Sequence, residues 1–217
     1  MLTILVTLKK TDKNLYYGYR NVFHGYISEL LGNENYGTTV NDYTYSCLCG
    51  GECTKDGITF KNNPYFYIRT NSEAVWQNFL SNIKNKKSIF NGFNVLGFSI
   101  VKDNLEKNSF ETDASSPILV SKKYRLVNNL SRDEIIDTEK YLVNSVFNKA
   151  KEMGVEVDDN LSIKIVRQRM HRDINYRGII NKGRNLKLMI NCDRKTKEFI
   201  LTHGLGRSTS CGFGFLI

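Results

Sequence analysis

Three histidines are the residues of this 217-residue chain best suited to proton transfer at neutral pH. The imidazole has a reference pKa of about 6.5, so it can act as a base or as an acid near neutrality. The three are His24, His171 and His203. In a helix expected over residues 14–31, Arg20, His24 and Ser28 are spaced four apart and share one face. This polar column could support acid–base chemistry, although a solvated helix face would give the same pattern.

A glycine-rich segment near the C-terminus could contact phosphate. Residues 204–214 read GLGRSTSCGFG and hold four of the 16 glycines of the chain. Exposed backbone amides there could form a cradle for phosphate oxygens, with Arg207 as the counter-charge. The alternative is a turn and strand in which glycine permits positive φ and close approach of another backbone.

The net charge of +9 is concentrated at the C-terminal end of the chain. Residues 1–160 contain 19 Lys and Arg against 19 Asp and Glu, whereas residues 161–217 contain 12 against 3. Such an asymmetry indicates a polyanionic partner, and a basic face kept for solubility is the alternative.

Composition and cysteine spacing exclude several other classes of protein. Cys47, Cys49 and Cys53 form a C-x-C-x3-C pattern, but no fourth Cys or His lies nearby, so incidental thiols are favoured over a metal site. We expect no metal and no cofactor. No apolar run approaches the roughly 20 residues of a membrane span, and no secretory signal pattern opens the chain. We therefore expect a cytoplasmic protein with no membrane segment and with reduced thiols.

Hydrophobic periodicity predicts the same order of elements twice, with Asn104–Ser116 as the connection. The first half is expected to have strands over 2–8, 43–48, 65–70 and 89–101, and helices over 14–31 and from a cap at Asn71 or Ser72. The second is expected to have strands over 118–127, 161–170, 186–192 and 210–217, a turn at 181–183, a helix capped by Ser131 and Glu134, and a helix over 197–203. This order predicts an α+β fold of two tandem ferredoxin-like (RRM-like) βαββαβ domains, residues 1–112 and 117–217, the second containing the glycine-rich loop.

The glycine-rich segment resembles the C-terminal signature of the CRISPR repeat-RNA processing endoribonucleases, the sixth Cas family of the RAMP superfamily. Three further segments are similar in order: Phe23–Ile27 (FHGYI), Tyr43–Ser46 (YTYS) and Ser116–Ile118 (SPI). The resemblance implies a pair of ferredoxin-like domains that bind one repeat of precursor CRISPR RNA. It also implies metal-independent cleavage by the 2′-hydroxyl of the RNA, which leaves a 2′,3′-cyclic phosphate and a 5′-hydroxyl.

Cleavage of this kind needs a base at the nucleophile, an acid at the leaving oxygen and donors on the phosphate. Because some members of the family place a catalytic histidine in the first helix, the resemblance points to His24, with Ser28 or Tyr17 assisting. His203 is expected only to end its helix. The residues assigned to RNA contact are Arg20, Arg167, Arg169, His171, Arg172, Arg177, Lys182, Arg184, Gly204, Gly206, Arg207, Ser208, Gly212 and Gly214.

One departure from the family keeps a second function open. Other members place the histidine in the loop after the first helix, and here residues 33–42 contain none. The alternative is a non-catalytic repeat-RNA-binding or effector-scaffold subunit of the same superfamily, and a third is an unrelated tandem ferredoxin-like RNA platform. Besides repeat RNA, effector-complex subunits and a second copy of the chain are candidate partners.

Overall fold

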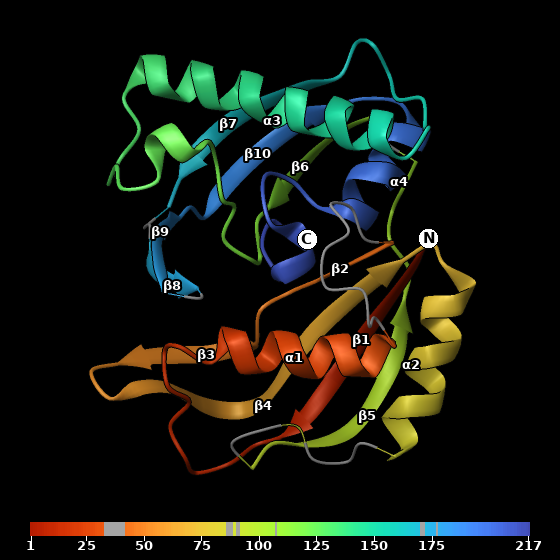
Figure 1. Cartoon of the computed structure of the whole chain (residues 1–217), viewed down its shortest axis with the longest axis vertical. Helices are drawn as coiled ribbons and strands as arrows, with labels where there is room; N and C mark the ends of the chain where they lie inside the picture. Colours follow the sequence, from red (N-terminus) through yellow and green to blue (C-terminus); the bar gives the residue numbers. More distant parts are fainter. Residues whose placement is uncertain (33–41, 86–88, 90–91, 107, 170–171, 177) are drawn as a thin grey trace.

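The computed structural model describes residues 1–32, 42–85, 89, 92–106, 108–169, 172–176 and 178–217 (Figure 1). The first half comprises β1 (Leu2–Lys9), α1 (Arg20–Leu31), β2 (Tyr43–Tyr45), β3 (Cys49–Thr54), β4 (Gly57–Thr70), α2 (Glu73–Asn85) and β5 (Asn94–Val101). Its antiparallel sheet has the order β2-β4-β1-β5, and β3 pairs with β4. With β3 taken as an addition, this is the strand order of a ferredoxin-like domain.

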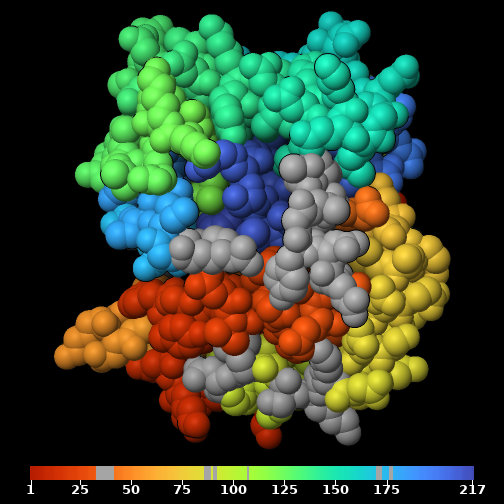
Figure 2. All heavy atoms as spheres, in the orientation of Figure 1, coloured from red at the N-terminus to blue at the C-terminus, as the bar shows by residue number. Residues whose placement is uncertain are grey.

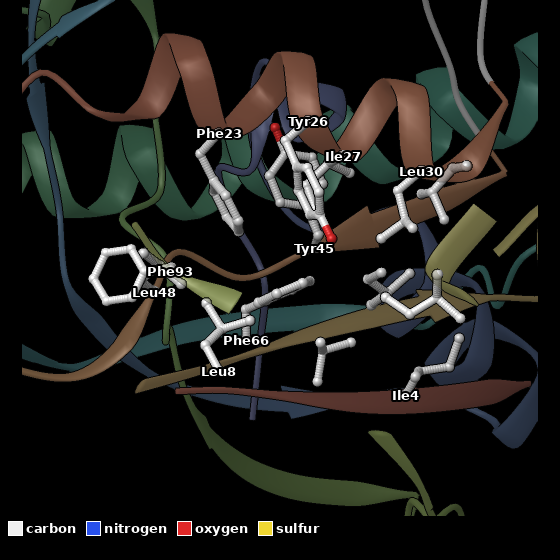
Figure 3. Close-up of a cluster of buried hydrophobic side chains, with 14 of the residues drawn as sticks. Ile4, Leu8, Phe23, Tyr26, Ile27, Leu30, Tyr45, Leu48, Phe66 and Phe93 are labelled. Carbon is white, nitrogen blue, oxygen red and sulfur yellow. The ribbon is translucent and has the colours of Figure 1, made fainter. Parts of the chain in front are cut away.

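Alternation along β1 creates the core of the first half. Ile4, Val6 and Leu8 are fully buried and face the two helices, as their period of two requires. Figure 3 shows Phe23 and Ile27 pointing from α1 toward the sheet. Burial of this apolar surface is the main force that holds α1 in place.

The second half repeats the plan with a smaller sheet. It comprises β6 (Ser109–Asp113), α3 (Arg132–Glu152), β7 (Ser162–Gln168), β8 (Arg172–Tyr176), β9 (Ile179–Gly183), β10 (Leu186–Asn191) and α4 (Arg194–His203). The sheet order is β6-β10-β7, and β8 pairs with β9 as a separate ribbon. Beside β6, a rudimentary fourth strand is formed where Ala114 bridges Leu216. The prediction of two ferredoxin-like units in tandem is confirmed.

Two strand predictions in the second half, those over 118–127 and 210–217, were wrong. The first strand is β6, within the predicted connection, because an edge strand with Phe110 as its one apolar residue carries a weak signal. Residues 118–127 instead form single bridges at Ile118 and Leu119 and then a 3₁₀ turn at Lys122–Tyr124. Residues 210–217 likewise begin in a 3₁₀ turn, Thr209–Cys211. The turn expected at 181–183 is part of β9.

The ends of the helices agree with the prediction where a local capping signal defines them. Ser131 and Glu134 form the predicted capping box of α3, with Ser131 N donating to Glu134 Oε2 at 2.8 Å. Helix α1, however, begins at Arg20 rather than at residue 14. The reason is a long-range contact, since Leu15 forms a β-bridge with Ile58.

A buried arginine joins the two halves. Arg69, on β4, is 3% exposed. Its Nη2 lies 2.7 Å from Asp103, and its Nη1 donates to the carbonyl oxygens of Leu201 and Leu216 at 3.3 and 3.0 Å. The guanidinium also lies over the Phe215 ring, 4.5 Å from its centroid. One side chain thus binds its own half and two segments of the other.

The described part of the chain contains no helix that is both long enough and apolar enough to cross a membrane.

Replacing Arg69 by alanine should lower the free energy of unfolding by about 3 kcal/mol or more, because a carboxylate and two buried carbonyls would each lose a charged donor. Urea unfolding measures this loss. Lys61→Ala is the control: it breaks an exposed pair with Glu52, 2.8 Å long, and should cost less than about 1 kcal/mol. Equal losses in the two variants would contradict a special role for Arg69.

Candidate active site at helix α1 and the glycine-rich loop

His24 projects from α1 toward β2, where a hydrogen bond fixes its ring. Its Nδ1 lies 2.8 Å from the hydroxyl oxygen of Tyr45, and the two rings are nearly parallel at 15°. Tyr45 is 1% exposed, so the sheet holds its hydroxyl firmly. No role was predicted for Tyr45 from the sequence. Its place in the YTYS segment was the only sequence feature that drew attention to it.

Arg20, one turn before His24, connects α1 to the glycine-rich loop, residues 204–214. Its Nη1 donates to the carbonyl oxygen of Gly212 at 3.3 Å, and its guanidinium lies 5.0 Å from the centroid of the Phe213 ring. The loop reaches the molecular surface between α1 and α3, where Figure 2 shows the C-terminal segment in dark blue. The structure therefore brings together the predicted cation, the predicted imidazole and the loop.

The glycines of the loop shape its backbone. Gly212 has φ 76°, and a Cβ there would lie 2.5 Å from the Tyr45 ring. Gly214 has φ 68°, and a Cβ there would overlap the carbonyl oxygen of Leu205. Its amide donates to the Pro117 carbonyl at 3.1 Å, so that amide is not available to a ligand.

Burial decides which loop residues can meet a ligand. Arg207 is half-buried, with its Nε donating to the Val120 carbonyl at 2.8 Å, and Ser208 is exposed. Thr209, Ser210 and Cys211 are half-buried like Arg207, so Ser208 is the most exposed side chain of the loop. The four glycines predicted to contact RNA, Gly204, Gly206, Gly212 and Gly214, are all buried and instead set the path of the backbone.

A lysine for which no role was predicted from the sequence stabilises the glycine-rich loop through hydrogen bonds. Lys149, on α3, donates to the carbonyl oxygens of His203 and Gly204 at 3.3 and 2.9 Å, and to Thr209 Oγ1 at 3.2 Å. Burial lowers the pKa of Lys149 from its usual range to about 7. His203 ends α4 as expected, but its ring is buried against Phe199, with centroids 4.5 Å apart.

The two proposed assistants of His24 lie in different surroundings. Ser28 is 6% exposed, whereas Arg20 and His24, on the same face of α1, are half-buried. The predicted exposed column is therefore wrong at Ser28. Tyr17 is half-exposed, before α1, and its hydroxyl donates to the Thr54 carbonyl of β3.

The predicted basic surface is only partly available. Arg184 is 2% exposed and donates to the carbonyl oxygens of Tyr124, Val127 and Asn128, so it is a structural residue and not an RNA contact. Arg167 is exposed on β7, and the nearby Arg169 lies 3.2 Å from Asp113.

Lys182 is largely buried on β9 and pairs with Asp173 at 2.6 Å. Arg172 belongs to β8, where its backbone pairs with Gly183 of β9. His171 and Arg177 lie outside the described residues.

The arrangement suits proton transfer beside an anion. A fixed imidazole can exchange a proton, while Arg20, on the same helix face, can stabilise negative charge on a phosphate. Among the residues that the structure describes, no group of three His, Cys, Asp or Glu is placed to hold a metal ion. This includes the three cysteines of the C-x-C-x3-C pattern.

The contribution of Lys149 to the free energy of unfolding should depend on pH. Between about pH 7 and pH 9 the unfolded chain keeps Lys149 protonated while the folded chain releases the proton, so the folded state gains stability as the pH rises. Relative to Lys149→Met, the parent should gain about 1 kcal/mol of unfolding free energy per pH unit in this range. Urea titrations of both proteins measure the difference in their unfolding free energies. The contributions of other titrating groups cancel in this difference because both proteins contain them. A pH-independent difference would contradict the lowered pKa.

Comparisons with known proteins bear on both fold and family. Two solved structures each cover 100% of this chain with a TM-score of 0.81: one characterised as a Cas6-related gene from Pyrococcus furiosus (18% identity, 97% of that chain), the other described as an RAMP protein binding different RNA substrates (17% identity, 98% of that chain). Thermus thermophilus Cse3, bound to an RNA representing a pre-cleavage complex, matches with a TM-score of 0.56 and 11% identity over 100% of this chain and 98% of that one. At these identities the likeness establishes the fold. Curated proteins give no match.

The family is established by sequence. The model of the family described as CRISPR associated protein Cas6, C-terminal, matches residues 99–217, which is more than half of the chain and includes the glycine-rich loop. The chain belongs to the CRISPR-associated Cas6 family.

Proposed function

We propose that this chain binds the repeats of precursor CRISPR RNA and cleaves them by attack of a ribose 2′-hydroxyl on the adjacent phosphate. The observation that carries the proposal is the placement of His24, which Tyr45 holds beside Arg20, itself bonded to the glycine-rich loop. Membership of the Cas6 family supports it, as does the likeness to Cse3, which was solved with an RNA representing a pre-cleavage complex.

The chemistry is a transesterification within the RNA. The 2′-hydroxyl loses its proton and forms a new bond to phosphorus, the bond from phosphorus to the 5′-oxygen breaks, and that oxygen gains a proton. The products are a 2′,3′-cyclic phosphate and a 5′-hydroxyl. Because Tyr45 engages Nδ1 of His24, the exchanged proton is carried on Nε2, and Arg20 offers N–H donors to the phosphate oxygens.

A binding subunit without nuclease activity is the second candidate. Burial of Ser28 removes one of the two hydroxyls proposed to assist His24, and Tyr17 is engaged with the Thr54 carbonyl. A likeness to the RAMP protein binding different RNA substrates is compatible with this function.

His24→Ala should lower the single-turnover rate of repeat-RNA cleavage by about 10² to 10⁴ while leaving RNA affinity unchanged, because it removes a general acid or base. Cleavage by the parent should persist in EDTA and should stop when a 2′-deoxy nucleotide occupies the cut site. Asn21→Ala, an exposed change on the same helix, is the matched control and should cut at the parental rate. Undiminished cutting by His24→Ala would remove His24 from the mechanism, and no cutting by the parent would favour the binding subunit.

RNA affinity should fall steeply as the salt concentration rises, because Arg167 on β7 and Arg169, which follows β7, contact phosphates of the RNA. The double variant Arg167→Ala/Arg169→Ala should reduce the slope of log affinity against log salt by about one to two, with less from Arg169 because Asp113 already neutralises it in part. The control Lys9→Ala/Lys84→Ala removes the same charge from exposed positions of the first half. If both double variants shift the slope equally, the assignment of the basic surface to β7 is wrong.

A further inference from the structure

A cleft of about 500 Å³ opens between the two halves beside the N-terminal end of α1. The first half contributes Arg20 and the start of β3, and the second contributes Ser115 and Asn185. Figure 1 shows β3 and the β8–β9 ribbon on the same side of the molecule. Since Arg20 also bonds the glycine-rich loop, the cleft adjoins the candidate active site.

The lining of the cleft combines apolar side chains with polar groups. Ile58 and Ile174 line it from opposite halves, and Tyr17 adds an aromatic ring at 53% exposure. Pockets of this composition bind organic ligands, and unpaired bases in particular stack on aromatic and apolar side chains.

One polar group in the cleft lacks a partner. The hydroxyl oxygen of Ser115 is buried and forms no hydrogen bond with any residue that the structure describes. A buried hydroxyl without a partner is unfavourable, and a ligand in the cleft could supply the missing bond. The side-chain amide of Asn185 is a second group with both donor and acceptor capacity in the same lining.

Charge indicates which part of a nucleotide enters. Asp173 places a largely exposed carboxylate in the lining, and Lys182 Nζ lies 2.6 Å from its Oδ1. A carboxylate disfavours phosphate and accepts hydrogen bonds from N–H groups of a base. Arg20, at the other side of the cleft, suits the phosphate.

We propose that this cleft receives one unpaired base of the repeat RNA adjoining the cleaved phosphate, and that the carboxylate of Asp173 accepts a hydrogen bond from an N–H group on the pairing edge of that base. The proposal rests on the proposed RNA function and adds a base-binding pocket to it. Ser115, Asp173 and Asn185 read the base, while Arg20 spans the pocket and the loop.

Two cysteines in the lining allow a direct test. Cys47 and Cys49 both face the cleft. A hydrogen bond from the Cys49 thiol and the positive charge of Arg20 lower the pKa of Cys47 below its usual range, which favours its alkylation by iodoacetamide near neutral pH. Saturating repeat RNA should slow alkylation of Cys47 about 10-fold, as read by mass spectrometry of its peptide. In a series of RNAs with one abasic nucleotide each, one position should abolish this protection at equal occupancy.

A double-mutant cycle gives a second readout. Ser115→Ala and Asp173→Asn should each weaken binding of the intact repeat about 10-fold, and should have no more than about a twofold effect on the RNA that is abasic at the position found above. Asp159→Asn, an exposed change outside the cleft, is the control and should behave as the parent with every RNA.

The outcomes separate this proposal from the function on which it rests. Tight, salt-dependent binding of repeat RNA that leaves Cys47 alkylation unchanged, with no coupling at any abasic position, would overturn the base pocket while the RNA function stands. A parent protein that fails to bind repeat RNA would overturn both.

Discussion

The placement of the two halves depends on the buried guanidinium of Arg69. It bonds Asp103, close to the first sheet, and the carbonyl oxygens of Leu201 and Leu216 in the second half. Those two carbonyls lie on either side of the glycine-rich loop in the chain, so one side chain fixes both flanks of the loop. A buried charge is tolerated only when its donors are satisfied, and this geometry leaves little freedom for the second half to shift. Because β4, which carries Arg69, also pairs with β2, the same contact fixes the loop relative to Tyr45.

Buried cations bonded to backbone carbonyls recur in this protein. Lys149 supports the end of α4 and the loop, and Arg184 binds three carbonyls around the 3₁₀ turn that replaces a predicted strand. Irregular backbone lacks the ladder partners of strands and helices, so its carbonyls need donors from side chains. Part of the basic excess of the last quarter is therefore structural. Net charge alone overestimates the surface available to RNA, as the burial of Arg184 demonstrates.

The sequence predicted those features that depend on local pattern, and it failed where distant contacts decide. Both ferredoxin-like units and the cap at Ser131 follow from periodicity and spacing. Strand β6 was missed because an edge strand needs few apolar residues. At the candidate site, spacing correctly placed Arg20 and His24 together, but periodicity did not reveal that His24 meets Tyr45 of β2 or that Ser28 is buried. Tyr45 lies 21 residues after its partner His24 in the chain, and Lys149 lies 54 residues before its partner His203. Periodicity carries no information about contacts at such separations.

The candidate chemistry is divided between the halves, and this division explains why their junction is so heavily bonded. The first half supplies the imidazole and its tyrosine anchor, whereas the second supplies the loop that presents Arg207 and Ser208. Catalysis by positioned groups is sensitive to errors of about 1 Å, so a site shared by two units needs a junction as rigid as a single core. Gly212 meets this demand by direct contact, since the absence of a side chain lets the loop backbone lie against the Tyr45 ring. Tyr45, which orients the imidazole of His24, thus also contacts the backbone of the loop. A displacement of the loop would therefore move Tyr45 and, through it, His24.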